Sequence, residues 1–327
     1  MTQAQGKYSN PFTATLNGIL ELFKKREPVG EISDEDRLDG KKVLITGASS
    51  GLGFAISVRL AEKGAHVIMA CRSGIPEKGE EVKKLSGSQQ VDMLAVDLSD
   101  LDSIKSLVSN FKKKFETCDI LICNAAMVPK QSRKTKQGLE EMFVVNYLSK
   151  YVLINLLMRN TCISSEDEGF PRVIIVSSES HRNSKEYRWD EFGVYKEYGM
   201  GKTVELYGYY KLLLTTLFKQ FRRNHLNEIQ FYSLCPGPVN SNIAREAPKL
   251  FQPLMKLIFS LFFRSPMKAS DPVIYFATSP RLAEKELEYL YLMSKKEVDE
   301  KAASKENGNL LFEKSEDLLS ELGFSWD

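Results

Sequence analysis

The 327-residue sequence lacks the patterns that mark metal-binding, disulfide-stabilised and membrane-spanning proteins. None of its five cysteines forms a C-x-x-C pair, so we expect reduced, mostly buried thiols in an intracellular compartment. The three histidines show no metal-binding cluster, so no metal is expected. No run reaches the roughly 18 apolar residues that a membrane-spanning helix needs.

An excess of either charge is also missing. The 45 Lys and Arg against 43 Asp and Glu leave a net charge of +2, without the concentrated basic face that nucleic-acid binding would need. No basic stretch leads into an apolar core at the N-terminus MTQAQGKYSN, so no secretory signal is expected. A cytoplasmic location, or a peripheral one on an internal membrane, is favoured.

Residues 1–38 form an N-terminal segment of their own. Apolar residues at helical spacing predict one amphipathic helix within residues 8–26, followed by an acidic linker with Pro28 and Gly30. The helix either packs on the rest of the chain or lies on a membrane surface, which Lys24–Arg26 would favour. The apolar stripe consists of Phe12, Leu16, Ile19, Leu20 and Phe23.

Residues 39–300 alternate between short apolar strands and helices. This order predicts a single α/β domain, a doubly wound parallel sheet with helices on both faces. Strands are expected at 43–45, 66–70, 92–99, 119–126, 172–178 and 229–237, and helices at 54–63, 103–115, 139–160 and 209–224.

The alternation ends after Pro236. Residues 240–270 are expected to form a substrate loop, in which the apolar stretch Lys249–Pro266 either caps the core or walls an apolar pocket. The charged tail at residues 301–327 is expected to be a solvated loop that ends in a helix.

The stretch TGASSGLG, Thr46–Gly53, fits two kinds of site. It matches the G-x-S-x-G elbow of a serine hydrolase, with Ser49 as the nucleophile. It also matches a glycine-rich turn that holds a dinucleotide pyrophosphate at a helix N-terminus. The hydrolase interpretation needs a histidine and an acid after Ser49. No histidine stands at a position in the sequence that suits such a catalytic triad.

Residues at the ends of later strands agree with the dinucleotide interpretation. Arg72 stands where an NAD site usually has an acidic residue, and a guanidinium there suits a 2′-phosphate, which favours NADP(H). Asp97 follows the third strand and is placed to bond the adenine edge. Tyr207 and Lys211 are four apart on one helix face, so the lysine is expected to lower the pKa of the phenol. Ser178 ends the fifth strand and could hold a substrate carbonyl near Tyr207.

Three further polar residues have weaker signals. Asn124 ends the fourth strand, and Asn146 lies inside an otherwise apolar helix. Each amide could equally be a satisfied core group. His181 follows the Ser178 segment and is either structural or part of the pocket lining.

The order of these motifs along the chain resembles that of the short-chain dehydrogenase/reductase superfamily. The motifs are TGASSGLG, the NAA turn, Asn146, Ser177-Ser178, Tyr207-x-x-x-Lys211 and Cys235-Pro236-Gly237. The resemblance covers about residues 40–300 and implies a Rossmann-type fold. Within the superfamily the sequence is similar to retinol dehydrogenases, WW-domain oxidoreductases and light-dependent protochlorophyllide reductases, although it lacks WW modules and the cysteine usual after the active-site lysine of the last group.

The resemblance implies specific roles. Tyr207 would exchange the proton, Ser178 would orient the carbonyl, Lys211 would assist Tyr207 and bind ribose, and Asn146 would hold a water that links Lys211 to solvent. The implied cofactor-binding residues are Gly47, Ser49, Ser50, Gly51, Leu52, Gly53, Arg72, Asp97, Leu98, Asn124, Ala125, Ala126, Tyr207, Lys211, Pro236, Gly237, Val239 and Ser241.

The sequence thus predicts an NADP(H)-dependent oxidoreductase that interconverts a carbonyl and an alcohol on an apolar retinoid, steroid or lipid-like substrate. The alternative is a catalytically idle scaffold or sensor of the same fold that only binds the cofactor. Peripheral membrane contact is a further expectation, and the resemblance implies a homodimer through residues 139–160 and 207–224.

Overall fold

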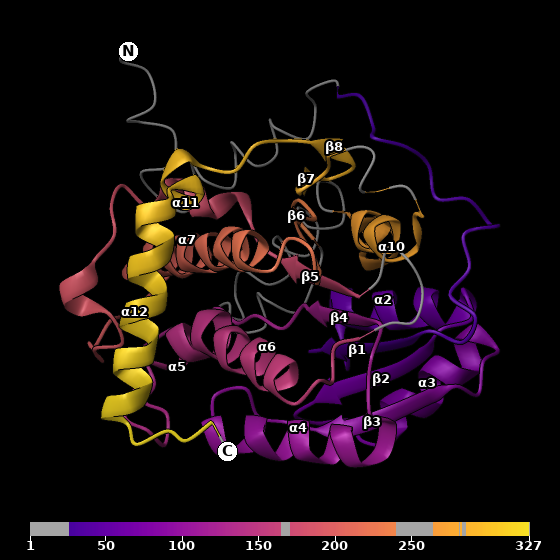
Figure 1. Cartoon of the computed structure of the whole chain (residues 1–327), viewed down its shortest axis with the longest axis horizontal. Coiled ribbons are helices and arrows are strands. Elements are labelled where there is room, and N and C mark those ends of the chain that lie inside the picture. The colour runs from indigo at the N-terminus through magenta and orange to yellow at the C-terminus, as the bar shows by residue number, and fades with distance from the viewer. Residues whose placement is uncertain (1–25, 165–170, 240–263, 281, 283–285, 327) are drawn as a thin grey trace, which may run out of the picture.

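The computed structural model describes residues 26–164, 171–239, 264–280, 282 and 286–326 (Figure 1). An 8-stranded sheet runs in the order β3-β2-β1-β4-β5-β6-β7-β8, with parallel pairing up to β7 and an antiparallel β8. This confirms the doubly wound, Rossmann-type α/β fold. The strands are β1 Lys42–Thr46, β2 His66–Cys71, β3 Val91–Ala95, β4 Ile120–Cys123, β5 Arg172–Val176, β6 Gln230–Cys235, β7 Tyr289–Tyr291 and β8 Ser294–Lys295.

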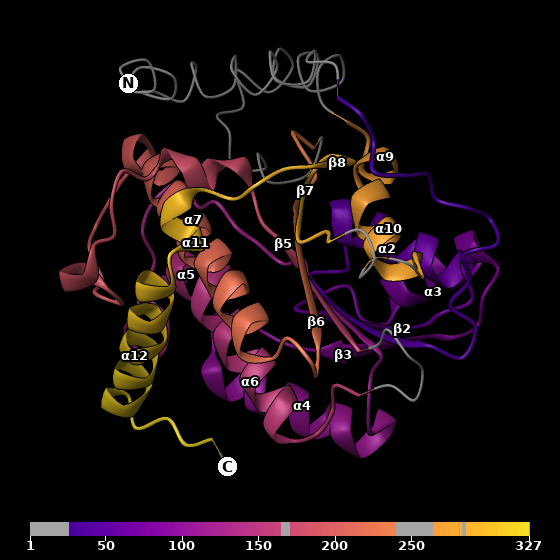
Figure 2. The same cartoon turned by 45° about the horizontal axis from the view of Figure 1, so that its top comes forward.

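Helices cover both faces of the sheet (Figure 2). Alternate residues of a strand belong to two different buried hydrophobic clusters, one on each face of the sheet. Leu44 belongs to the cluster that includes α4, α6, α7 and α12, and Val43 belongs to the cluster that includes α2, α3 and α10. The α-helices are α2 Gly51–Glu62, α3 Glu77–Ser86, α4 Leu101–Phe115, α5 Glu141–Phe143, α6 Ser149–Arg159, α7 Met200–Asn224, α9 Pro266–Ala269, α10 Asp271–Thr278, α11 Glu300–Ala303 and α12 Lys305–Glu321. Between them lie a π-helix, η1 Val144–Leu148, and two 3₁₀ turns, η2 Glu179–Asn183 and η3 Trp189–Glu191.

The expected helix at 139–160 is not one continuous α-helix. Its middle is the π-helix η1, where the Ser149 N–H donates to the Val144 carbonyl five residues earlier. The wider turn includes Asn146. Helix α3 and strands β7 and β8 were not expected from the sequence.

The charged tail is also different from the expectation. Its helical part is longer than expected, because α11 and α12 take up most of the tail, and α12 packs against α7 (Figures 1 and 2). The Tyr147 hydroxyl lies 2.6 Å from Ser315 Oγ, and the ring of Phe312 meets those of Tyr151 and Phe221. Part of the surface expected to form a homodimer is therefore covered by α12 of the same chain, and the dimer stays a prediction.

Several expectations lie outside the described residues. They are the amphipathic helix within residues 8–26, most of the stretch Lys249–Pro266, and Ser241. Within the described part of the chain, no helix combines the length and apolarity needed to cross a bilayer.

Candidate active site

The turn between β1 and α2 needs its glycines. Gly47 and Gly51 have φ of +67° and +56°, in the left-handed region where a side chain is strained. A Cβ on Gly53 would lie 2.2 Å from the Gly47 carbonyl oxygen. Only glycine allows α2 to begin so close to the turn, with its N-terminal N–H groups facing the space above it. Ser50, the N-cap residue, makes no capping bond with its hydroxyl.

Asn124 ties this turn to the neighbouring strand. Its amide nitrogen donates to the carbonyls of Thr46 and Gly47 at 3.0 and 3.1 Å. The backbone N–H of Asn124 donates in return to the Thr46 hydroxyl at 3.2 Å. The Asn124 side chain is thus a structural clamp that holds the glycine turn against the end of β4.

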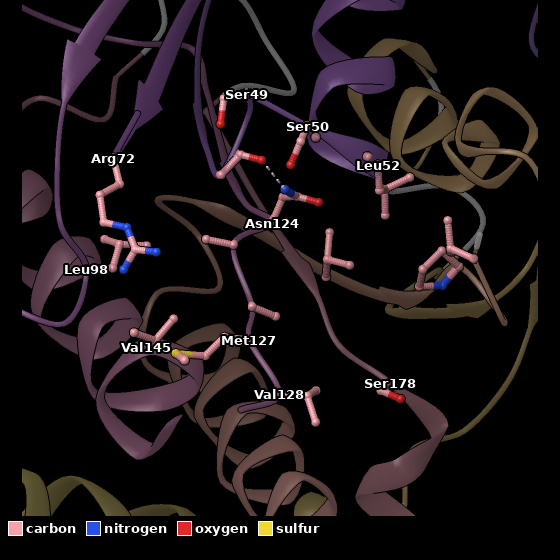
Figure 3. Close-up of a pocket in the computed structure, with 18 of the residues that line it drawn as sticks. Ser49, Ser50, Leu52, Arg72, Leu98, Asn124, Met127, Val128, Val145 and Ser178 are labelled. Atoms are coloured by element: carbon pink, nitrogen blue, oxygen red, sulfur yellow. Dashed lines mark hydrogen bonds between the residues drawn. The ribbon is translucent and has the colours of Figure 1, made fainter. Parts of the chain in front are cut away.

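Almost all of the predicted cofactor residues surround one cavity of about 610 Å³ at the carboxyl ends of the strands. Arg72 and Ser178 lie on opposite sides of it, and Ser49 and Ser50 lie near the glycine turn (Figure 3). Ser178, Tyr207 and Lys211 also line the cavity. So do Gly47, Leu52, Gly53, Asp97, Leu98, Ala125, Ala126, Pro236, Gly237 and Val239, whereas Ser241 lies outside the described residues.

The Arg72 side of the cavity is exposed. Arg72 follows the buried strand β2, and its side chain reaches solvent. Asp97 Oδ1 accepts hydrogen bonds from the Ser99 N–H and hydroxyl at 2.9 and 2.7 Å. One oxygen of Asp97 is therefore used to hold its own turn.

Tyr207 and Ser178 face one another. Gly208 makes this approach possible, because a Cβ there would lie 2.9 Å from the Ser180 carbonyl oxygen in η2. Burial raises the pKa of Tyr207, the nearby Cys235 thiol raises it further, and a hydrogen bond with Ser178 lowers it. Without a ligand, Tyr207 is therefore a protonated phenol at neutral pH.

The expected effect of Lys211 on Tyr207 is not found in this structure. The Lys211 ammonium donates to the Val176 carbonyl at 3.0 Å and lies 5.6 Å from the centre of the Tyr207 ring. Burial lowers the pKa of Lys211 to about 8. The prediction of a lowered Tyr207 pKa is wrong here because burial of the phenol outweighs its distance-weakened attraction to the ammonium.

Asn146 lies behind the cavity and is fully buried. Its side-chain oxygen accepts from the Met127 N–H at 2.9 Å and its nitrogen donates to the Met127 carbonyl at 2.9 Å. Asn146 therefore fixes the loop that follows β4, which carries the cavity residues Met127 and Val128.

His181 does not line the cavity. Its Nδ1 lies 2.6 Å from the Ser178 carbonyl, and its Nε2 accepts from the Asp299 N–H at 3.1 Å, which fixes the neutral tautomer. Burial lowers the pKa of His181 to about 4. The residue is structural and joins the Ser178 turn to the C-terminal segment.

The cavity also contains residues that the sequence did not single out. Val145 lies in η1 beside Asn146, and the Asn146 hydrogen bonds to Met127 hold the loop after β4. These additional residues include Cys71, Ser73, Val96, Met127, Val128, Pro129, Arg133, Val145 and Pro238.

The arrangement suits a dinucleotide better than a hydrolase triad. The glycine cradle, the open α2 N-terminus and the two serine hydroxyls fit a pyrophosphate. His66 pairs with Asp92 at 2.7 Å and His225 with Glu228 at 3.0 Å, and none of the three histidines lines the described cavity. Ser49 therefore has no base within the described site.

Comparisons with known proteins agree with the dinucleotide-binding interpretation of the site. The short chain dehydrogenase family profile matches residues 41–195. Human retinol dehydrogenase 11 is 31% identical over 266 residues, 80% of each chain, and human retinol dehydrogenase 14 is 28% identical over 82% of this chain and 85% of its own. The NADPH-dependent 3-quinuclidinone reductase from Rhodotorula rubra superposes with a TM-score of 0.59 at 19% identity, over 83% of this chain and 97% of its own.

The retinol dehydrogenase relatives extend across most of the chain, well beyond the part that the family profile matches. Members of this family bind nicotinamide cofactors and are oxidoreductases. The chain belongs to the short-chain dehydrogenase/reductase superfamily, in its retinol dehydrogenase-like branch.

Proposed function

We propose that this protein is an NADP(H)-dependent oxidoreductase that interconverts an alcohol and a carbonyl on an apolar substrate. The observation that carries the proposal is the single cavity lined by the glycine turn, Ser178, Tyr207 and Lys211. A bound nicotinamide would supply or accept the hydride. The chain's own residues then need only hold the substrate oxygen and move one proton.

Tyr207 moves that proton. In the reduction, its protonated hydroxyl donates to the carbonyl oxygen as this becomes an alcohol, and the reverse reaction returns the proton to Tyr207. Ser178 donates a hydrogen bond to the same oxygen. Lys211 is buried beside Tyr207, where its positive charge stabilises a phenolate once ligands exclude water from the cavity.

The choice of NADP(H) rests on Arg72. Its exposed guanidinium at the end of β2 suits the 2′-phosphate, to which it can donate two parallel hydrogen bonds. Ser73 also lines the cavity there and adds a hydroxyl donor. The 3-quinuclidinone reductase of the same fold is named as NADPH-dependent.

The substrate class rests on the apolar part of the cavity lining. Met127, Val128, Pro129 and Val239 line the same cavity as Ser178 and Tyr207. Such a wall favours an apolar alcohol or carbonyl, and two relatives are named retinol dehydrogenases. Retinoids, steroids and lipid carbonyls are therefore the first substrates to test. We keep peripheral membrane contact and a homodimer as further proposals.

Two measurements test the proposed function. NADPH fluorescence is titrated with protein, and NADPH consumption is followed across a panel of retinoid, steroid and lipid carbonyls. Tyr207→Phe should lower turnover by about 10²- to 10⁴-fold while cofactor affinity stays near that of the wild type. Tyr232→Phe, a buried tyrosine on β6 outside the cavity, is the control. NADPH binding without turnover of any carbonyl would favour the scaffold instead.

A further inference from the structure

The loop after strand β4, residues 127–140, forms part of the cavity wall and is bonded to the helix that carries Tyr207. We call it the β4 loop. The Thr203 hydroxyl on α7 donates to the Pro129 carbonyl at 3.1 Å. Thr203 and Tyr207 are four residues apart in α7, so they lie on one face of the helix in successive turns. The β4 loop therefore passes about one helical turn from Tyr207. The loop residues that line the cavity are Met127, Val128, Pro129 and Arg133.

The middle of the β4 loop is held by hydrogen bonds rather than by apolar packing. Residues 130–138 are all exposed or only partly buried. The Ser132 N–H donates to the Tyr198 carbonyl at 3.0 Å, and the Tyr198 N–H donates to Ser132 Oγ at 3.2 Å. The Lys134 ammonium lies 4.7 Å from the centre of the Tyr195 ring. A segment with few buried apolar contacts opens at a low free-energy cost, so each of these bonds matters for its position.

The Tyr198 hydroxyl fixes the far end of the same loop. It donates to Glu140 Oε1 at 2.6 Å, and Glu140 Oε2 accepts from the Phe143 N–H at 2.7 Å. Glu140 is 2% exposed and Tyr198 is 8% exposed, so water competes little for this bond. Burial and the Glu140 carboxylate both raise the pKa of Tyr198, which keeps its hydroxyl a donor at neutral pH. Tyr198 thus joins Ser132 in the middle of the loop to Glu140 at its end.

The two anchoring residues lie at the start of α7. Tyr198 precedes the helix by two residues, and Thr203 lies in its first turn. At the near end of the loop, Met127 is held by the Asn146 side chain on η1. The glycine turn and Arg72 belong to other elements, which are β1, α2 and the end of β2. Loss of an anchor on α7 should therefore move the loop wall without moving the phosphate-binding part of the cavity.

We propose that Tyr198 and Thr203 are positioning residues that hold the β4 loop against the Tyr207 side of the cavity and so set the affinity for the carbonyl substrate. The inference rests on the proposed function. Neither residue is part of the described cavity lining, so each acts through the loop that it holds. With the loop in place, Pro129 gives the substrate an apolar contact about one helical turn from the proton donor.

Two variants each remove one anchoring hydroxyl with little change of shape. Tyr198→Phe loses the bond to Glu140, and Thr203→Val loses the bond to Pro129. In both, the KM for retinal should rise about fivefold, roughly the effect of losing contact with one or two methylene groups. The kcat and the KM for NADPH should stay within about twofold of the wild type, because only substrate binding is weakened.

Tyr187→Phe is the matched control. The Tyr187 hydroxyl lies 2.5 Å from Thr216 Oγ1 on α7 and donates to the Lys301 carbonyl at 3.1 Å. Both bonds are made away from the β4 loop, so this variant should leave all three kinetic constants unchanged. An equal rise of the KM for retinal in the control would overturn the proposal. So would an unchanged KM for retinal in both anchor variants, or a KM for NADPH that rises as much as that for retinal.

A second readout needs no substrate. Trypsin can cut the β4 loop at four exposed basic residues once the loop opens. A lost hydrogen bond to a carboxylate should make cleavage of native Tyr198→Phe about tenfold faster than that of the wild type or Tyr187→Phe. Thr203→Val, which loses a bond between neutral groups, should be cut about threefold faster. Mass spectrometry should place the cuts after Lys130, Arg133, Lys134 or Lys136.

The two readouts separate this inference from the proposed function. An unchanged rate of cleavage within the β4 loop in both anchor variants would refute the hold of Tyr198 and Thr203 on the loop. If the wild type turns over no carbonyl, the proposed function fails, while the trypsin measurement still decides how the loop is held.

Discussion

A single methyl group added at Gly208 should disturb the geometry of the active site more than the stability of helix α7. Glycine inside a helix is less stable than alanine by about 0.5–1 kcal/mol, so Gly→Ala normally stabilises a helix. At Gly208, however, the new Cβ would lie 2.9 Å from the Ser180 carbonyl oxygen. The new Cβ and the Ser180 carbonyl oxygen are both fixed to the backbone and cannot rotate away from each other. Such overpacking costs about 1–3 kcal/mol. The net change in the free energy of unfolding should be a loss of roughly 0–2.5 kcal/mol.

The effect on catalysis should be larger than the effect on stability. Relief of the contact requires η2 and α7 to separate by about half an ångström, which moves Ser178 away from Tyr207. A displacement of 1 Å can cost about 100-fold in rate, so we expect a roughly tenfold loss of kcat. Gly201→Ala, seven residues earlier in the same helix, has nothing within 4 Å of its new Cβ and is the matched control. Thermal unfolding and NADPH consumption should be measured for both. A Gly208→Ala variant as stable and active as Gly201→Ala would refute the close approach.

Three further predictions concern the cofactor, the Ser178 turn and α12. Arg72→Leu should raise the KM for NADPH about 10- to 100-fold and leave that for NADH unchanged in steady-state kinetics, because only the 2′-phosphate contact is lost. Folding lowers the pKa of His181 to about 4, so the wild type should lose up to about 3 kcal/mol of stability as the pH falls from 6.5 to 4. The His181→Gln variant should lose correspondingly less over the same pH range, as measured by urea unfolding. Leu311→Ala, fully buried on α12, should cost about 2–5 kcal/mol in urea unfolding, whereas the part-exposed neighbour Leu310→Ala should cost much less.

The central strands and the residues at their ends could be predicted because a parallel sheet repeats one simple pattern. Apolar strands alternate with helices, and the carboxyl ends of all parallel strands meet at one edge. Residues as distant as Gly47, Arg72, Ser178 and Tyr207 could therefore be assigned to one site from their order alone. The sheet in turn brings them to one cavity.

A helix at the end of the tail was expected, but the extent of α12 and its packing on the core were not, because its buried face is only partly apolar. Gly308, Leu311, Ser315 and Leu319 are its buried residues, at helical spacing, but two of the four are small or polar. The hydrophobic period is therefore faint in a segment rich in charge. Small residues are needed there because α12 packs closely on α7, where a Cβ on Gly308 would meet Gln220 at 2.3 Å.

The π-helix was missed for a different reason. The residues of η1 are all buried, so the apolar run shows no face that would reveal the wider turn. The loop from Met127 to Arg133 could not be placed either, because its position depends on the Asn146 clamp and not on local propensity. Sequence reasoning found Asn146 as a polar exception but not its partner.

The environment of Tyr207 connects these features to the direction of the reaction. A phenol whose pKa is raised by burial stays protonated at neutral pH, which suits donation of a proton to a carbonyl. Accepting a proton from an alcohol requires positive charge nearby. Among the described residues, Lys211 is a lysine close to the ring, and its ammonium now donates to the Val176 carbonyl. Reduction should thus need only the protonated Tyr207, whereas oxidation should need a deprotonated Tyr207 beside a charged Lys211. The two directions should therefore respond to pH in opposite ways through the same side chain.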